Sequence, residues 1–423
     1  MTQTCTERDG LTHAVFLRRL AGAPSATSAD ARLGNGAFLA LRLVDLLGPG
    51  RGPAHADVFR YQQAATERVC RELPADRTET AHLAGLVRSA ADAFRTSDVG
   101  LVVPALLAYA HYLENELLLE EALDVLEALI HVGGPTLNSP DAIGVRLRLA
   151  RVFRKLNSVE EADARYSEAG RLASSAGDLR SALLSEIGRA LVVQARGDLR
   201  GAEEALRGIL ADARAKFYEE AEAGAWHALG TTLFLRGDVA GAITCVWRAF
   251  ESYDDEPSQL RALNEIGMLF LSLGEADVAE LALSEVVRRG ARPDMVTNAM
   301  IELMHCSTYR GDRIGFERWR GQCLSLLNRM PPNMIADFHL KAGIGYARFG
   351  NFRVADELLT EALTVAAAHD LHELEFRVER IKGGLHECQS LLAAAPVTFK
   401  EPTQDLSLRE VRLSLKEFAT IHG

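Results

Sequence analysis

The sequence has 423 residues and a formal net charge of −11, and it is 48% hydrophobic with only 6% aromatic residues. A net negative charge disfavours nucleic acid or an anionic membrane as the main partner. No run of about 18 apolar residues exists, and the start, MTQTCTERDG, lacks the charged and then apolar pattern of a signal peptide. We therefore expect a cytoplasmic protein without a membrane span.

Runs of alternating valine, isoleucine and threonine, which would indicate strands, are nearly absent, so the sequence predicts an all-α protein. The cysteines form no CxxC pair, and a disulfide framework is not expected in a chain this long. We interpret the following residues as small, mostly buried thiols: Cys5, Cys70, Cys245, Cys306, Cys323 and Cys388.

Residues 1–53 are predicted to form an N-terminal extension that is partly flexible. A short helix is expected over 11–20, a flexible link over 21–36 and an apolar segment over 38–47. The GPGRGP stretch at 48–53 has glycines, but no strand precedes it and no Lys-Ser/Thr pair follows. This stretch therefore indicates a linker rather than a phosphate-binding loop.

Two helical patterns follow, near 55–73 and 78–95. We interpret residues 54–98 as a degenerate helical pair that caps the N-terminal end of a repeat array, because terminal repeats are usually atypical.

From residue 99 to residue 395 a turn signal recurs every 37–40 residues. Glycine and asparagine, which adopt left-handed backbone conformations most readily, dominate these positions. The turns are placed at Leu117, Asn157, Gly197, Gly237, Gly274, Gly311 and Gly350. Small residues also recur seven residues before and five residues after a turn, as at Gly230 and Ala242, which predicts close helix crossings.

The clearest copy is WHALGTTLFLRGDVAGA, residues 226–242. Its Trp226, Leu229-Gly230, Leu233 and Ala242 resemble the tetratricopeptide repeat (TPR), with its W-x2-L-G-x2-Y pattern and later alanine. The resemblance implies a right-handed superhelical α-solenoid of antiparallel helix pairs, about seven in this array, with the first helix of each pair lining a concave groove. The period exceeds the usual TPR length and resembles that of solenoids in bacterial transcriptional and peptide-sensing regulators.

The copy around Gly311 departs from the pattern, because Met304 and Phe316 replace small residues and Arg320 replaces a large apolar one. Added volume at a close crossing shifts the helices, so we expect an irregular junction there. A looser stretch, VGGPTLNSP, is expected at 132–140.

Residues 396–423 are predicted to be a linker and an amphipathic helix, with one apolar stripe formed by Leu408, Val411, Leu415 and Phe418. We expect this helix to fold back over the last repeat pair, or to dock on a second copy or a partner. Its LSLREVRLSL sequence resembles the first helix of a LuxR-type DNA-binding domain, but no recognition helix follows, which disfavours direct DNA binding.

Arg-Gly-Asp occurs at 196–198, 236–238 and 310–312, always at a repeat turn. This placement favours a capping role over cell adhesion. The arginine would face the negative end of the first helix, the glycine would end that helix, and the aspartate would cap the second.

A zinc site is suggested by His369 and His372, with His386, Glu387 and Cys388 further along the chain. The HExxH and HxxEH spacings of zinc proteases are absent from this stretch. We interpret these residues as solvated polar residues. No nucleophile elbow or kinase motif set is present, so we expect no enzyme activity, no cofactor and no metal.

The segment IGVRLRLARVFRKL, residues 143–156, separates an apolar arc from a basic one on a single helix. The basic arc contains Arg148, Arg151, Arg154 and Lys155. The same TPR mapping places these residues near the groove: His111, His227, Thr231, Arg261, Asn264, Met268, Asn298, His305 and Lys341. A basic stripe on an acidic protein can select an acidic peptide, although an ordinary solvated face stays an alternative. Leu147 stands where a chaperone-binding TPR has its first clamp lysine, so chaperone tail binding is not implied.

We therefore predict a non-enzymatic scaffold or adaptor that binds a protein or peptide in the concave groove of the solenoid. The alternative is a regulatory sensor whose solenoid binds a signalling peptide or small ligand and switches a downstream regulator. An enzyme is a third, less favoured class. The sequence leaves a homo-oligomer open.

Overall fold

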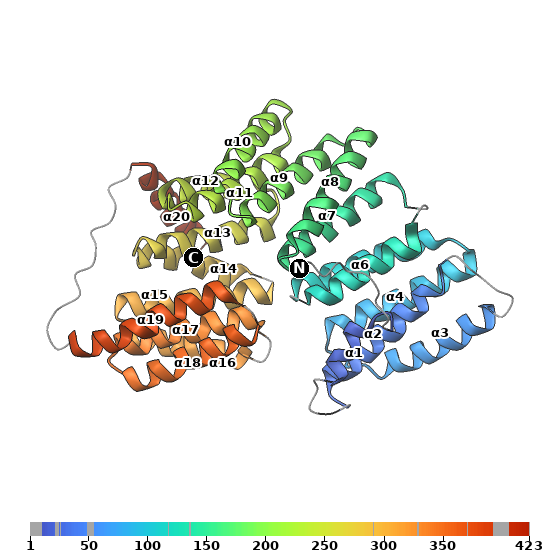
Figure 1. Cartoon of the computed structure of the whole chain (residues 1–423), viewed down its shortest axis with the longest axis horizontal. Helices are drawn as coiled ribbons and strands as arrows, with labels where there is room; N and C mark the ends of the chain where they lie inside the picture. The colour runs from blue at the N-terminus through green and yellow to red at the C-terminus, as the bar shows by residue number, and fades with distance from the viewer. Residues whose placement is uncertain are drawn as a thin grey trace, which may run out of the picture. The chain divides into compact units, whose positions relative to one another are not determined.

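The computed structural model describes most of the chain. The described residues are 11–21, 25, 27–48, 55–116, 118–134, 137–290, 292–327, 330–369, 371–391 and 406–422. Within these ranges the side chains of Glu373, 386–391, 406–407 and 419–422 are left aside. The described residues form α-helices and a short 3-10 helix, with no strand among them, which confirms the all-α class (Figure 1).

The chain divides into two compact units, residues 1–196 and 197–423. The predicted array at 99–395 spans the boundary between these two units. Helices of the first unit are α1 (Ala14–Ala21), α2 (Ala29–Asp45), α3 (His55–Arg71), α4 (Thr78–Thr96), η1 (Val99–Val102), α5 (Val103–Asn115), α6 (Leu119–Gly133), α7 (Ser139–Lys155), α8 (Val159–Ala176) and α9 (Leu179–Ala195).

Helices of the second unit are α10 (Leu199–Ala215), α11 (Glu219–Leu235), α12 (Val239–Ser252), α13 (Glu256–Ser272), α14 (Ala276–Arg289), α15 (Pro293–Arg310), α16 (Arg313–Leu326), α17 (Pro332–Arg348), α18 (Phe352–Ala368), α19 (His372–Leu391) and α20 (Leu406–His422). Within each unit, helices adjacent in sequence pack together, as in α7 with α8, α11 with α12 and α17 with α18. This is the helix-pair architecture of a TPR-type solenoid.

The predicted turns are confirmed wherever the chain is described. Backbone φ is positive at Asn157 (59°), Gly197 (88°), Gly237 (88°), Gly274 (82°), Gly311 (71°) and Gly350 (81°). Leu117 lies outside the described residues. The left-handed residue ends the first helix of a pair, and only glycine or asparagine adopts that conformation at little cost.

The close crossings also lie where small residues recur. A Cβ added at Gly230 on α11 would be 2.5 Å from Cγ2 of Val246 and 3.1 Å from the carbonyl oxygen of Ala242 on α12. Ala242 itself is fully buried. The α11–α12 pair therefore depends on the missing side chain at Gly230.

In the copy around Gly311 the helices α15 and α16 are both continuous. Helix α16 packs far less on the following helix α17 than α12 does on α13 or α14 on α15, which agrees with the expected irregular junction. Phe316 is fully buried. Its ring occupies the space beside Gly345 on α17, where a Cβ would be 2.2 Å from the ring. The extra volume is thus accommodated by a glycine in the following helix.

The N-terminal prediction needs correction, because residues 29–36 belong to helix α2 rather than to a flexible link. Ser28 caps this helix by accepting a hydrogen bond from the Ala31 amide. Leu33, Leu41 and Val44 are buried in a core shared with α4, α5 and α6. Helices from residues 1–53 and from residues 54–98 therefore share one hydrophobic core.

Each Arg-Gly-Asp aspartate caps the following helix, as predicted. The side chains of Asp198, Asp238 and Asp312 accept hydrogen bonds from the amides of Gly201, Gly241 and Gly315 at 2.8, 2.9 and 2.9 Å. The arginines do more than face a helix end. Arg196 pairs with Asp163 on α8, Arg236 with Glu203 on α10, and Arg310 with Glu280 on α14. The tripeptides therefore join neighbouring helix pairs.

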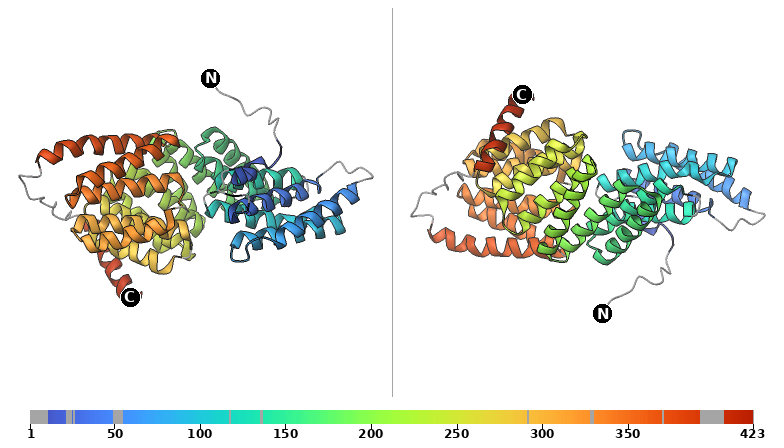
Figure 2. Two further views of the ribbon diagram at one scale, coloured as in Figure 1. Left: turned by 90° about the horizontal axis from the view of Figure 1, so that it is seen from below. Right: turned by 90° about the horizontal axis from the view of Figure 1, so that it is seen from above.

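Helix α20 folds back within the second unit, where it lies on α12 and α14 rather than over the last repeat pair (Figures 1 and 2). None of the helices in the described residues is long and apolar enough to cross a membrane.

Burial matches the thiol interpretation where side chains are described. Cys245, Cys306 and Cys323 are buried and Cys70 is half-buried, all without a disulfide. Burial raises the pKa of the Cys70 and Cys245 thiols to about 11. Cys5, Cys388, His386 and Glu387 lie outside the described side chains. No group of three His, Cys, Asp or Glu side chains in the described part of the chain is placed to hold a metal.

Candidate binding site

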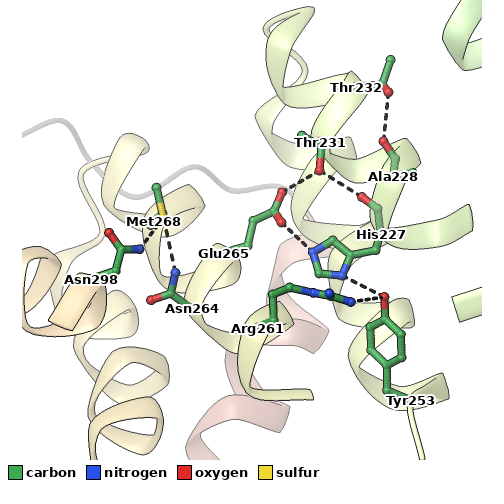
Figure 3. A network of polar contacts seen from close by, with 10 residues as sticks. All are labelled: His227, Ala228, Thr231, Thr232, Tyr253, Arg261, Asn264, Glu265, Met268 and Asn298. Carbon is green, nitrogen blue, oxygen red and sulfur yellow. Dashed lines mark hydrogen bonds and ion pairs between the residues drawn. The ribbon is translucent and has the colours of Figure 1, made fainter. Parts of the chain in front are cut away.

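A row of polar side chains crosses the first helices α11, α13 and α15 of the second unit (Figure 3). On α11, His227 and Thr231 are one helical turn apart and both contact Glu265 on α13. The His227 Nε2–Glu265 distance is 2.7 Å, and the Thr231 hydroxyl donates to the other carboxylate oxygen at 3.1 Å. Since a carboxylate only accepts, Nε2 is the donor.

The same histidine has a second partner. Its Nδ1 lies 3.0 Å from the hydroxyl of Tyr253, which in turn accepts a hydrogen bond from Arg261 at 3.2 Å. Burial raises the pKa of Tyr253, so this hydroxyl keeps its proton and can donate it to Nδ1. Arg261, Tyr253, His227 and Glu265 therefore form a continuous chain of hydrogen bonds that fixes the histidine ring.

Next to this chain, three side chains have weaker partners. The side-chain amides of Asn264 on α13 and Asn298 on α15 both donate to the sulfur of Met268, at 3.7 and 3.9 Å. A thioether is a poor acceptor. The Asn264 carbonyl oxygen is buried with no hydrogen-bond partner in the described structure, and Met268 is 39% exposed. These amides are held in place but not saturated.

A second cluster lies on α15 and α17. The ammonium of Lys341 is 2.5 Å from Glu302 and 2.6 Å from Asp337, and only 5% of Lys341 is exposed. Burial alone would lower the pKa of Lys341, but attraction to Asp337 and Glu302 outweighs it and raises the pKa. Lys341 is therefore a charged, buried link between two helix pairs rather than an open cation.

His305 is also buried. Burial first, and then repulsion from Lys341, Arg348 and Arg377, lower its pKa well below the usual value, so the imidazole is neutral. Its ring packs edge-on against Tyr309 at 4.9 Å, and the Arg348 guanidinium lies 4.3 Å from the centre of the same tyrosine ring. Within the described structure its Nδ1 has no hydrogen-bond partner.

The basic stripe on α7, in the first unit, has an internal partner that sequence reasoning missed. Arg148, Arg151 and Lys155 all contact the carboxylate of Glu114 on α5, at 3.0, 2.9 and 2.8 Å. The Glu114 side chain is only 1% exposed. Burial opposes ionisation, but attraction to the three cations outweighs it and lowers the pKa of Glu114. The three cations thus keep part of their surface in solvent, and each is also paired with a buried carboxylate.

The candidate residues thus fall into separate groups. Arg148, Arg151, Arg154 and Lys155 belong to the first unit, and the remaining candidates apart from His111 belong to the second. Arg154 has its Nε buried without a hydrogen-bond partner in the described structure, and His111 is exposed on α5. The structure adds Glu114, Tyr253, Glu265, Glu302 and Asp337. Most of these lie about one repeat from the residue they bind, a spacing that could have flagged them.

With this geometry in place, the fold can be assigned to the TPR class of α-solenoids. Searches of family models and of curated proteins gave no match. Among solved structures, the chain is similar to the Rap conjugation gene regulator of plasmid pLS20 in complex with the Phr* peptide, at 12% identity and a TM-score of 0.54. That match covers 82% of this chain and 96% of the regulator.

Two further structures resemble the chain less closely. The apo quorum sensor NprR from B. thuringiensis matches at 10% identity and a TM-score of 0.48, over 80% of this chain and 88% of NprR. A Rap protein complexed with Competence and Sporulation Factor matches at 12% identity and a TM-score of 0.47, over 86% of this chain and 98% of that protein. At these identities the similarity concerns the fold alone.

Proposed function

We propose that the protein is a non-enzymatic binding protein that holds a peptide segment of another protein on the first helices of residues 197–423. The observation that supports this most directly is the pair of amides at Asn264 and Asn298, whose hydrogens point at a thioether. A primary amide both donates and accepts, as a peptide backbone does, so a peptide offers both side chains a better partner than sulfur.

The surroundings suit such a ligand. Met268 is exposed and flexible, so its thioether can adapt to side chains of different shape. The chain of hydrogen bonds through His227 and Glu265 fixes the neighbouring wall of the site, formed by α11 and α13, before binding. A preformed wall lowers the entropy lost on association.

The binding site can be tested with a random dodecapeptide display library selected on the full chain. Affinities of the selected peptides would be measured by fluorescence anisotropy for the wild type and for an Asn264→Ala, Asn298→Ala double variant. We expect the double variant to lose at least about ten-fold in affinity, since each lost hydrogen bond contributes about 1 kcal/mol. Asn333→Ala, an exposed asparagine on α17, is the matched control. A library that yields no binder, or binders indifferent to the double variant, would contradict the proposal.

A second candidate function is that of a sensor, in which a signalling peptide or small ligand changes the solenoid and thereby a downstream regulator. The similarity to a Rap regulator solved with its peptide, over 82% of this chain, favours keeping this candidate. Small-angle scattering with and without a selected peptide separates the two. A change in radius of gyration on binding supports the sensor, and an unchanged value supports the scaffold.

The predicted preference for an acidic segment stays a prediction. The four cations of the basic stripe, Arg148, Arg151, Arg154 and Lys155, outnumber Glu114, so a positive excess remains on the stripe although its charges are partly paired. An acidic partner would meet this excess in the first unit.

A further inference from the structure

Helix α20 lies on the second helices α12 and α14 (Figure 2). Leu408, Val411 and Leu415, spaced three and four residues apart, are 0%, 3% and 1% exposed. On the other side of the helix, Leu413 is 51% exposed and Arg409 is exposed. The apolar stripe predicted from the sequence is therefore the docking face.

One ion pair fixes the register of this helix. The guanidinium of Arg412 donates two hydrogen bonds to the carboxylate of Glu275, at 2.7 Å from Nε and 2.5 Å from the terminal nitrogen. The two side chains are 18% and 8% exposed, so water is largely excluded from the pair. A bidentate pair in such surroundings is specific for arginine, because lysine cannot match both carboxylate oxygens in one plane.

An aromatic contact marks the other end of the docking face. The ring of Phe418 meets Phe250 of α12 edge-on at 5.5 Å, and the Arg289 guanidinium of α14 lies 5.6 Å from the Phe418 ring. The contacts of α20 thus follow α14 from Glu275 at its start to Arg289 at its last residue.

We propose that the surface formed by α12, α14 and Glu275 is a binding site for an amphipathic helix, and that α20 is a ligand carried by the chain itself. A partner helix with the same pattern would displace it. That pattern places apolar residues at positions 1, 4 and 8, an arginine at position 5 and an aromatic residue at position 11.

The interaction has the strength expected of an exchangeable contact. A helix of this length is marginal in water on its own and forms only when its stripe is covered. Helix α20 is held on the repeats by three buried apolar side chains, one aromatic ring and one ion pair. It is also joined to the repeats covalently through residues 392–405. Covalent attachment gives α20 an effective concentration on the order of millimolar, so a free helix must compete against it.

The competition can be measured with a fluorescein-labelled peptide of residues 405–423 and the full-length chain. Arg412→Glu in the chain places two carboxylates together and should release its own α20. We expect this variant to bind the wild-type peptide at least ten-fold more tightly than the wild-type chain does, by anisotropy. Arg409→Glu makes the same charge change on the exposed side of α20 and should bind like the wild type. The three tryptophans, Trp226, Trp247 and Trp319, all lie in the second unit, so an unchanged tryptophan emission shows that this unit of each variant is folded.

A charge swap supplies the second arm. Chains with Glu275→Arg should reject the wild-type peptide and bind a peptide carrying Arg412→Glu. If Arg412→Glu does not fold, Leu415→Asp serves as the opening variant with the same expected gain. The proposal is overturned if the opened chains bind the peptide no better than the wild type, or if both peptides bind Glu275→Arg equally. Neither result bears on the proposed peptide site at Asn264, Met268 and Asn298, because these variants do not change α13 or α15.

Discussion

His13 should make the stability of the first unit depend on pH between neutral and alkaline conditions. Its side chain is 5% exposed and lies between two carboxylates, with Nδ1 2.5 Å from Asp124 on α6 and Nε2 3.1 Å from Asp45 on α2. Burial opposes the charge, but hydrogen bonds and attraction from Asp124 and Asp45 outweigh it and raise the pKa of His13 to about 9. The protonated ring therefore joins α2 and α6 just before α1 begins.

The sign and size of this pH effect on the free energy of unfolding follow from the linkage between proton binding and folding. A raised pKa means that the folded state holds the proton more tightly than the unfolded chain, so the stabilisation is complete below pH 6.5 and declines up to about pH 9. The interval between these values corresponds to about 3 kcal/mol, since one pKa unit is worth about 1.4 kcal/mol. This is a large part of the stability of an ordinary domain.

The comparison requires a variant that preserves the backbone. His13 has a φ of 64°, and asparagine tolerates this left-handed region better than other non-glycine residues, so His13→Asn is suitable. The free energy of unfolding would be measured for both proteins by urea unfolding followed by far-UV circular dichroism. The stability advantage of the wild type over the variant should be about 3 kcal/mol larger at pH 6 than at pH 9.5. Tryptophan emission reports only the second unit and should not shift. A difference between the two proteins that is constant with pH would refute the role of His13.

Three further predictions concern packing, buried charge and capping. Gly230→Leu should lower the unfolding free energy of the second unit by about 3 kcal/mol or more, read from tryptophan emission, because even a Cβ meets Val246 at 2.5 Å; a loss under about 1 kcal/mol would contradict the close crossing. Changing Arg148, Arg151 and Lys155 together to Glu should destabilise the first unit by about 3–5 kcal/mol through the stranded Glu114, so dichroism should show an earlier urea midpoint. Asp238→Ala should cost about 1 kcal/mol in the second unit, whereas Asp238→Asn should retain most of the cap; equal losses would count against a hydrogen-bonded cap.

Features set by the local sequence were predictable. At the described turns inside the repeat pairs, the residue with positive φ is glycine or asparagine, so the turns at Asn157, Gly237 and Gly350 could be placed from the sequence alone. A close crossing excludes side-chain volume, which made Gly230 and Ala242 visible in the same way. The capping role of the Arg-Gly-Asp aspartates followed from their position at these turns.

Features set by distant packing were not visible in the pattern of any single helix. Residues 21–36 have a linker-like composition, yet Gly34 approaches the Phe16 carbonyl and Gly36 approaches Leu73, so here the glycines serve packing within a helix. Helical spacing placed Arg148, Arg151 and Lys155 on one face but could not show that Glu114, on another helix, neutralises part of their charge. A single-helix projection contains no information about the neighbouring helix.

These contacts change what the polar residues on the first helices mean. Lys341 and His227 looked like groove residues, but each hydrogen-bonds a carboxylate on an adjacent first helix. Such pairs stabilise the stacking of repeats and leave little hydrogen-bonding capacity for a ligand. Asn264 and Asn298 differ, because their only described acceptor is a thioether. We therefore expect unsatisfied hydrogen-bonding capacity, rather than polarity or charge, to separate residues available to a ligand from residues that join the repeats.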